Sequence, residues 1–89
     1  MIEREVEIVN RLGLHARAAA KLVHTAGAYQ SRVTLSRDGE EVDAKSILGV
    51  LLLAAAQGST LHIRCDGSDE GDAMRAVTEL IANRFDEES

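Results

Sequence analysis

The sequence has no proline or tryptophan, and only one cysteine, one tyrosine and one phenylalanine among its 89 residues. The single cysteine, Cys65, excludes an internal disulfide framework and fits a reducing compartment. With Tyr29 and Phe85 as the only aromatic residues, the chain lacks a stacking platform for single-stranded nucleic acid. The longest apolar stretch, residues 47–56, is far shorter than the roughly 20 residues that cross a bilayer.

Positive charge is also scarce, because 10 lysines and arginines face 15 aspartates and glutamates, which leaves a net charge of -5. This balance argues against a nucleic-acid or anionic-membrane surface. Residues 1–5 lack the basic end and apolar core of a signal peptide. We therefore expect one cytoplasmic domain over residues 1–89 that binds neither nucleic acid nor membrane.

Four segments show the period of two that is typical of strands with one buried face. Between residues 2 and 8, three glutamates alternate with Ile2, Arg4, Val6 and Ile8. The same alternation occurs in residues 32–37, 40–43 and 60–66, and Asp38-Gly39 predicts a tight turn. Because each strand keeps a polar face, we expect a sheet that is covered on one side only, which favours antiparallel pairing.

Apolar stripes predict a first and a last helix. The stripe in residues 19–26 indicates the first helix, and Gly27 stands where a C-terminal cap is expected. The stripe in residues 73–81 indicates the last helix, with Ser68 or Asp69 as its N-cap.

A middle helix is predicted from Ser46 to about Ala56, with Gln57-Gly58 ending it. The element order is then β-α-β-β-α-β-α. This order predicts an α+β fold in which a four-stranded antiparallel sheet carries three helices on one face. The acidic tail, residues 85–89, is expected to be frayed.

The first candidate site is the segment Gly13-Leu14-His15-Ala16-Arg17, between the first strand and the first helix. His15 falls at the helix start, where free backbone N–H groups form an anion site. The positive helix end opposes protonation of the imidazole and favours a neutral nucleophile near pH 7. A phosphoryl group on the ring would meet these amides and the guanidinium of Arg17. The alternative, a capping histidine beside a solvated arginine, is favoured by the spacing alone.

The second candidate site is Ser46, a good N-cap for the middle helix. A phosphate on its hydroxyl would suit the same helix end, although local physics alone favours a plain cap. The apolar residues 47–53 cannot all face one core, so part of this helix is expected to form an exposed protein-binding surface. The alternative is that the short helix is wedged deep in a small core.

No metal site and no cofactor are expected from the remaining residues. His62 and Cys65 are three apart on a predicted strand and therefore point to opposite faces. His24 is expected on the surface of the first helix, where it would rim a docking face. The sequence shows no paired carboxylates, no Ser-His-Asp set and no glycine-rich nucleotide loop.

Taken together, these residues make the chain resemble the HPr family, the histidine-containing phosphocarriers of the bacterial phosphoenolpyruvate-dependent phosphotransferase system. The resemblance covers nearly the full length and rests on residues 13–17, 44–50 and 54–58 and on the element order. Two such blocks at the family's spacing, followed by a third, outweigh the plain-cap alternatives at both sites.

The resemblance implies an open-faced β-sandwich and a phosphoryl carrier that other proteins modify and restore, not an enzyme with turnover. His15 would accept phosphate on Nδ1 from phospho-enzyme I and pass it to enzyme IIA domains. Arg17 and the backbone of Ala16, Arg17 and Ala18 would steady the phosphate. Ser46 matches the regulatory serine that HPr kinase/phosphorylase modifies. A monomer is expected, whose partners dock on Ala20, His24, Ile47, Leu48 and Leu51.

One departure from the family pattern is Ala18, which stands where proline is usual. Its N–H adds a donor near the phosphate, which we expect to make phospho-His15 a slightly poorer donor. The departure leaves room for a nitrogen-branch paralogue, or for a regulatory module in which Ser46 alone switches a partner. An acyl-carrier-like domain is a third alternative, but four strand segments oppose that all-helical fold, and no aspartate precedes Ser46.

Overall fold

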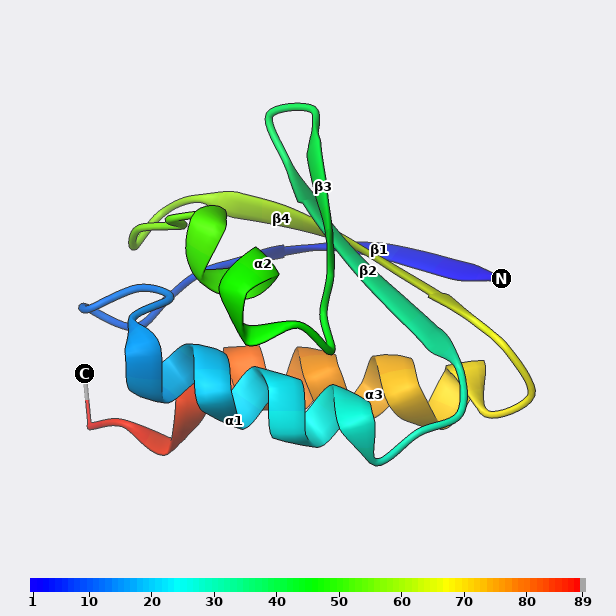
Figure 1. Cartoon of the computed structure of the whole chain (residues 1–89). Coiled ribbons are helices and arrows are strands. Elements are labelled where there is room, and N and C mark those ends of the chain that lie inside the picture. The colour runs from blue at the N-terminus through cyan, green and yellow to red at the C-terminus, as the bar shows by residue number, and fades with distance from the viewer. Residues whose placement is uncertain (89) are drawn as a thin grey trace.

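The computed structural model describes residues 1–88. One antiparallel sheet contains four strands in the order β1-β4-β2-β3, namely β1 (Ile2–Glu7), β2 (Arg32–Arg37), β3 (Glu40–Asp43) and β4 (Thr60–Asp66). The helices are α1 (Ala16–Gly27), α2 (Ile47–Leu52) and α3 (Glu70–Ala82), followed by a 3₁₀ turn, η1 (Arg84–Asp86). Figure 1 shows all of them on the same side of the sheet. The predicted fold class is confirmed.

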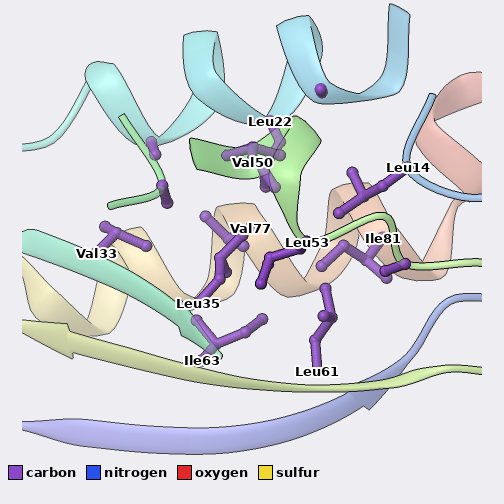
Figure 2. Packing of buried hydrophobic residues seen from close by; sticks show 14 of the residues in the cluster. Leu14, Leu22, Val33, Leu35, Val50, Leu53, Leu61, Ile63, Val77 and Ile81 are labelled. Atoms are coloured by element: carbon purple, nitrogen blue, oxygen red, sulfur yellow. The ribbon is translucent and has the colours of Figure 1, made fainter. Parts of the chain in front are cut away.

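Strand β4 is at the centre of the sheet and sets its two faces. Ile63 lies opposite Arg4 of β1 and Leu35 of β2. Leu61, Ile63 and Cys65 are fully buried, whereas the residues between them are partly exposed. The predicted alternation is therefore correct for β4, and its apolar face meets the helices, where Leu22, Val50 and Val77 complete the core (Figure 2).

The middle helix is shorter than the sequence predicts. It ends at Leu52 instead of about Ala56, and Ala54 has a left-handed φ of 49°. Tertiary contacts draw the following segment away from the helical path: Arg37 Nη1 donates to the Leu53 carbonyl at 3.0 Å, and the Leu14 amide donates to the Ala55 carbonyl at 2.8 Å. Within residues 1–88, every helix is too short or too polar to cross a membrane.

The C-terminal segment is ordered against the core, so the prediction of a frayed tail from residue 85 is wrong for residues 85–87. Phe85 is fully buried, and Lys21 Nζ donates to its carbonyl at 2.7 Å. Burying a large aromatic side chain favours an ordered segment over a solvated one. Figure 1 shows this segment returning beside the start of α1. Residue 89 lies outside the described residues.

Two predicted helix ends differ in detail. Gly27 is the last residue of α1, and the C-cap is Ala28, which keeps a right-handed helical backbone. Asp69 does occupy the N-cap position of α3, but its carboxylate makes no capping hydrogen bond. It accepts hydrogen bonds from the backbone N–H groups of Gln30 and Ser31 instead, across the α1–β2 loop.

Candidate functional site

His15 is the N-cap residue of α1, as the sequence predicts. Its backbone is extended, with φ -76° and ψ 177°, and its carbonyl accepts the first helical hydrogen bond from Ala19 at 2.8 Å. Leu14, 5% exposed, is buried beside it and anchors the loop, because its amide bonds to the Ala55 carbonyl. The buried leucine and the helix start together fix the backbone of His15, whose side chain is 27% exposed.

Gly13 allows the loop to approach the rest of the chain closely. Its φ is +66°, and a Cβ there would lie 2.6 Å from the Ala55 carbonyl oxygen and 2.9 Å from Ala56 Cα. Both the backbone conformation and the contact exclude a side chain. Steric exclusion of a side chain therefore explains why the motif has glycine at position 13.

The first turn of α1 leaves three backbone N–H groups free. Within residues 1–88, the amides of Ala16, Arg17 and Ala18 have no backbone acceptor, and the His15 side chain does not cap them. Ala16 and Arg17 are exposed, whereas Ala18 is fully buried. Of these three amides, that of Ala18 belongs to a residue with no exposed surface, so no ligand reaches it unless neighbouring atoms move.

An open cavity of about 440 Å³ lies beside the imidazole. It is lined by Arg11, Leu12, His15, Arg17 and Glu87. The guanidinium groups of Arg11 and Arg17 favour a group with negative charge on oxygen here, whereas the Glu87 carboxylate in the same lining opposes it.

Sequence reasoning missed Arg11, Asn10 and Glu87 at this site. Arg11 is close to the motif in sequence, so its proximity was a usable signal. Glu87 is 72 residues away from His15, and its carboxylate oxygen Oε2 nevertheless contacts Nε2 of the imidazole. No local pattern indicates such a contact.

The pKa of Glu87 lies below its ordinary value. Burial of the carboxyl by itself raises this pKa, but the hydrogen bonds from Asn10 and His15, with the positive charge of Lys21, outweigh it. Glu87 is therefore a carboxylate at neutral pH, although its side chain is only 15% exposed.

Ser46 is the N-cap of α2, as predicted. Its hydroxyl oxygen accepts a hydrogen bond from the Gly49 amide at 3.2 Å, and the residue is half-buried. Next to it, Lys45 Nζ donates to the Tyr29 carbonyl at 2.7 Å. The hydroxyl thus belongs to the start of a short helix at the surface.

The apolar surface predicted on the middle helix is present. Ile47 is 40% exposed, Leu48 71% and Leu52 74%, while Leu51 is half-buried and Val50 enters the core. The alternative of a fully wedged helix is therefore wrong. Leu52 is one of the residues that the sequence predicts cannot all be buried, but it was not among the docking residues that the family resemblance implies.

The exposed face of α1 supplies the remaining predicted docking residues. Ala20 and His24 are exposed and line an open cavity of about 400 Å³ with Arg17, Lys21, Thr25, Leu80 and Asp86. Arg17 lines this cavity and the one beside His15. The two surfaces are therefore contiguous.

His62 and Cys65 point to opposite faces, as expected. His62 Nε2 contacts Glu3 Oε1 at 2.7 Å on the open face of the sheet, and Cys65 is fully buried on the helix side. Burial raises the pKa of the Cys65 thiol, so it is an unreactive core residue. Within residues 1–88, no group of three or more histidine, cysteine, aspartate or glutamate side chains is placed to hold a metal ion.

The fold and site define a small α+β domain that presents a histidine at a helix start beside an open cavity. The family model described as "PTS HPr component phosphorylation site" matches residues 2–83. The chain belongs to the HPr family of phosphocarrier proteins.

Known proteins agree with this assignment in sequence and in structure. The phosphocarrier protein HPr of Xylella fastidiosa strain Temecula1 is 56% identical over 89 residues, which covers 100% of both chains. The crystal structure of HPr-C-His from Thermoanaerobacter tengcongensis superposes with a TM-score of 0.97 at 40% identity, again over 100% of both chains.

Similar structures also include a dimer. The HPr dimer from Thermoanaerobacter tengcongensis has a TM-score of 0.79 at 40% identity and covers 98% of this chain and 100% of its own. The expectation of a monomer therefore has no support from these comparisons.

Proposed function

We propose that His15 accepts a phosphoryl group from phospho-enzyme I on Nδ1 and passes it to enzyme IIA domains. In this proposal the chain acts as a single domain over residues 1–89, needs no cofactor and works in the cytoplasm. It is not an enzyme, because the phosphohistidine is formed and consumed by its partners.

The observation that carries this proposal is the position of His15 at the open start of α1. This proposal is supported by the amides of Ala16 and Arg17, which have no backbone acceptor within residues 1–88, and by Arg17, which lines the same cavity as His15. A charge-assisted hydrogen bond contributes roughly 1.5–3 kcal/mol and a helix end about 0.3–1 kcal/mol. Contributions of this size hold a phosphoryl group without trapping it.

The apolar face beside the site gives this proposal a docking surface. Ile47, Leu48 and Leu51 of α2 and Ala20 and His24 of α1 would contact enzyme I and the IIA domains. A carrier that exchanges partners quickly needs small interfaces, and exposed apolar side chains grouped on one helix mark such a protein-binding surface.

The test is phosphorylation by phosphoenolpyruvate and enzyme I, followed by intact mass, with His15→Ala as the matched variant. We expect one phosphoryl group that is lost in acid and absent from the variant, because protonation makes the imidazole a good leaving group. No transfer from a competent cognate enzyme I would overturn the carrier function and favour the regulatory alternative, a nitrogen-branch or purely regulatory paralogue.

We further propose that Ser46 is a regulatory phosphorylation site for HPr kinase/phosphorylase. A phosphate there would lie at the start of α2 and beside the exposed leucines, so it would change the docking surface directly. Incubation with that kinase and ATP is expected to add one acid-stable phosphate, absent from Ser46→Ala. An unmodified wild-type chain would contradict this.

A further inference from the structure

The carboxylate of Glu87 joins His15 to a buried asparagine. Its oxygen Oε2 contacts His15 Nε2, and its oxygen Oε1 accepts a hydrogen bond from Asn10 Nδ2 at 2.9 Å. The three residues come from the loop after β1, the start of α1 and the C-terminal segment. Only the tertiary structure brings them together.

The amide of Asn10 has a fixed orientation. Its Nδ2 group also donates to the Gly13 carbonyl at 2.8 Å, so both of its hydrogens have acceptors. Turning the amide over would place Oδ1 against two oxygens. Asn10 is fully buried, and its Oδ1 has no partner within residues 1–88. Asn10 can therefore only donate toward residue 87.

The C-terminal segment holds Glu87 in place through neighbouring contacts. Phe85 is fully buried, and the Glu87 amide donates to the Arg84 carbonyl at 2.9 Å. Lys21 Nζ donates to the Phe85 carbonyl at 2.7 Å. The carboxylate thus reaches the imidazole from a packed segment.

We propose that Glu87 is a positioning residue for His15, whose carboxylate keeps the ring proton on Nε2 and leaves the Nδ1 lone pair free for phosphorus. A carboxylate can only accept a hydrogen bond, so the ring nitrogen facing it must carry the hydrogen. This inference rests on the proposed function, in which His15 is the phosphoryl acceptor.

The chemistry balances without proton transfer to Glu87. The Nδ1 lone pair forms a bond to phosphorus, and the bond from phosphorus to the donor's leaving group breaks with its electron pair. The ring keeps its Nε2 proton and becomes positively charged. The carboxylate beside Nε2 stabilises that charge as it develops.

The structure predicts that the conservative variant of residue 87 is phosphorylated more slowly than the truncated one. In Glu87→Gln, the side-chain oxygen must face Asn10, which can only donate, so the NH₂ group faces His15. The imidazole must then accept at Nε2 and carry its proton on Nδ1, where it blocks the nucleophile. Glu87→Ala leaves both tautomers open. We therefore expect E87Q to be the slower of the two.

The experiment combines two measurements. Long-range ¹H–¹⁵N spectra, at a pH where the imidazole is neutral, report which ring nitrogen carries the proton. Intact mass follows labelling by phosphoramidate, a small donor whose phosphorus–nitrogen bond breaks to release ammonia, so that no partner protein is involved. Glu88→Gln is the matched control, because Glu88 is exposed and adjacent.

We expect the Nε2–H tautomer in the wild type and in E88Q, and the Nδ1–H tautomer in E87Q. Labelling of E87Q is expected to be roughly tenfold slower than wild type, since one hydrogen bond must be given up to free Nδ1. A wild type that is labelled at His15, with E87Q matching it in tautomer and rate, overturns the role of Glu87. A wild type that phosphoramidate does not label at His15 overturns the carrier function instead.

Discussion

Asp69 at the start of α3 binds Ser31, 38 residues earlier in the chain, through both its backbone and its side chain. The Ser31 amide donates to Asp69 Oδ1 at 2.9 Å, the Ser31 hydroxyl donates to the same oxygen, and the Gln30 amide donates to Oδ2 at 2.8 Å. One carboxylate thereby ties the α1–β2 loop to the third helix. These hydrogen bonds lower the pKa of Asp69 below its ordinary value of 3.8, and the bond from the Ser31 hydroxyl contributes most.

Acid should weaken this connection. Because the pKa of Asp69 is lower in the folded state, its contribution to stability is complete above the unfolded value and is lost as pH falls through the folded one. We expect Asp69→Ala to lower the free energy of unfolding at pH 7. Below about pH 4, the unfolding free energy of this variant should decrease less steeply with falling pH than that of the wild type. Urea unfolding at several pH values measures this. Asp72→Ala, on the exposed side of the same helix, is the control, and an equal loss at every pH for D69A would contradict the assignment.

Removing the aromatic ring of Phe85 should destabilise the fold. Phe85 is fully buried, so Phe85→Ala is expected to cost about 3–5 kcal/mol of unfolding free energy. Phe85→Leu, which fills more of the space, should cost less than about 1.5 kcal/mol. Urea unfolding compares the two. A loss near zero for F85A would restore the frayed tail that the sequence predicts.

A side chain at position 13 should disturb both stability and the site. Gly13→Ala combines a left-handed φ with a Cβ 2.6 Å from the Ala55 carbonyl oxygen, and we expect a loss of about 2–4 kcal/mol. Gly58→Ala is the matched control, because Gly58 also has positive φ but no atom within 4 Å of its Cβ position. Calorimetry that finds equal losses in the two variants would show that the contact at Ala55 costs nothing.

Proline at position 18 should be tolerated and should make phospho-His15 more labile. The Ala18 amide has no backbone acceptor within residues 1–88, and proline suits the first helical turn. If this amide contacts the phosphate once neighbouring atoms have moved, Ala18→Pro removes one donor and speeds hydrolysis by about threefold. Intact mass over time measures the rate. Unchanged hydrolysis and transfer rates would count against the contact.

Ala19→Pro is the structural control for that variant. The Ala19 amide donates to the His15 carbonyl at 2.8 Å, so proline at position 19 breaks the first helical bond of α1. We expect A19P to unfold at lower denaturant concentration than A18P. Equal stabilities would mean that the start of α1 is not where the structure places it.

The sequence by itself determined the strands and helices that show a regular alternation of apolar and polar residues. The alternation in residues 60–66 predicts which side of β4 is buried, because side chains on a strand point to opposite faces in turn. Ser46 is identifiable as a cap for the same kind of reason, since its hydroxyl acts within three residues. The position of His15 at the start of α1 can also be predicted locally, because its motif lies between the first strand pattern and the first helix pattern.

The tertiary structure decided where elements end and what surrounds His15. Helix α2 ends at Leu52 because residues 53 and 55 are bound to Arg37 and Leu14. The C-terminal segment packs because Phe85 enters a core built by other elements, and only then does Glu87 reach the imidazole. Local patterns report interactions over a few residues, whereas a contact across 72 residues forms only when the sheet and helices have packed and brought its two ends together.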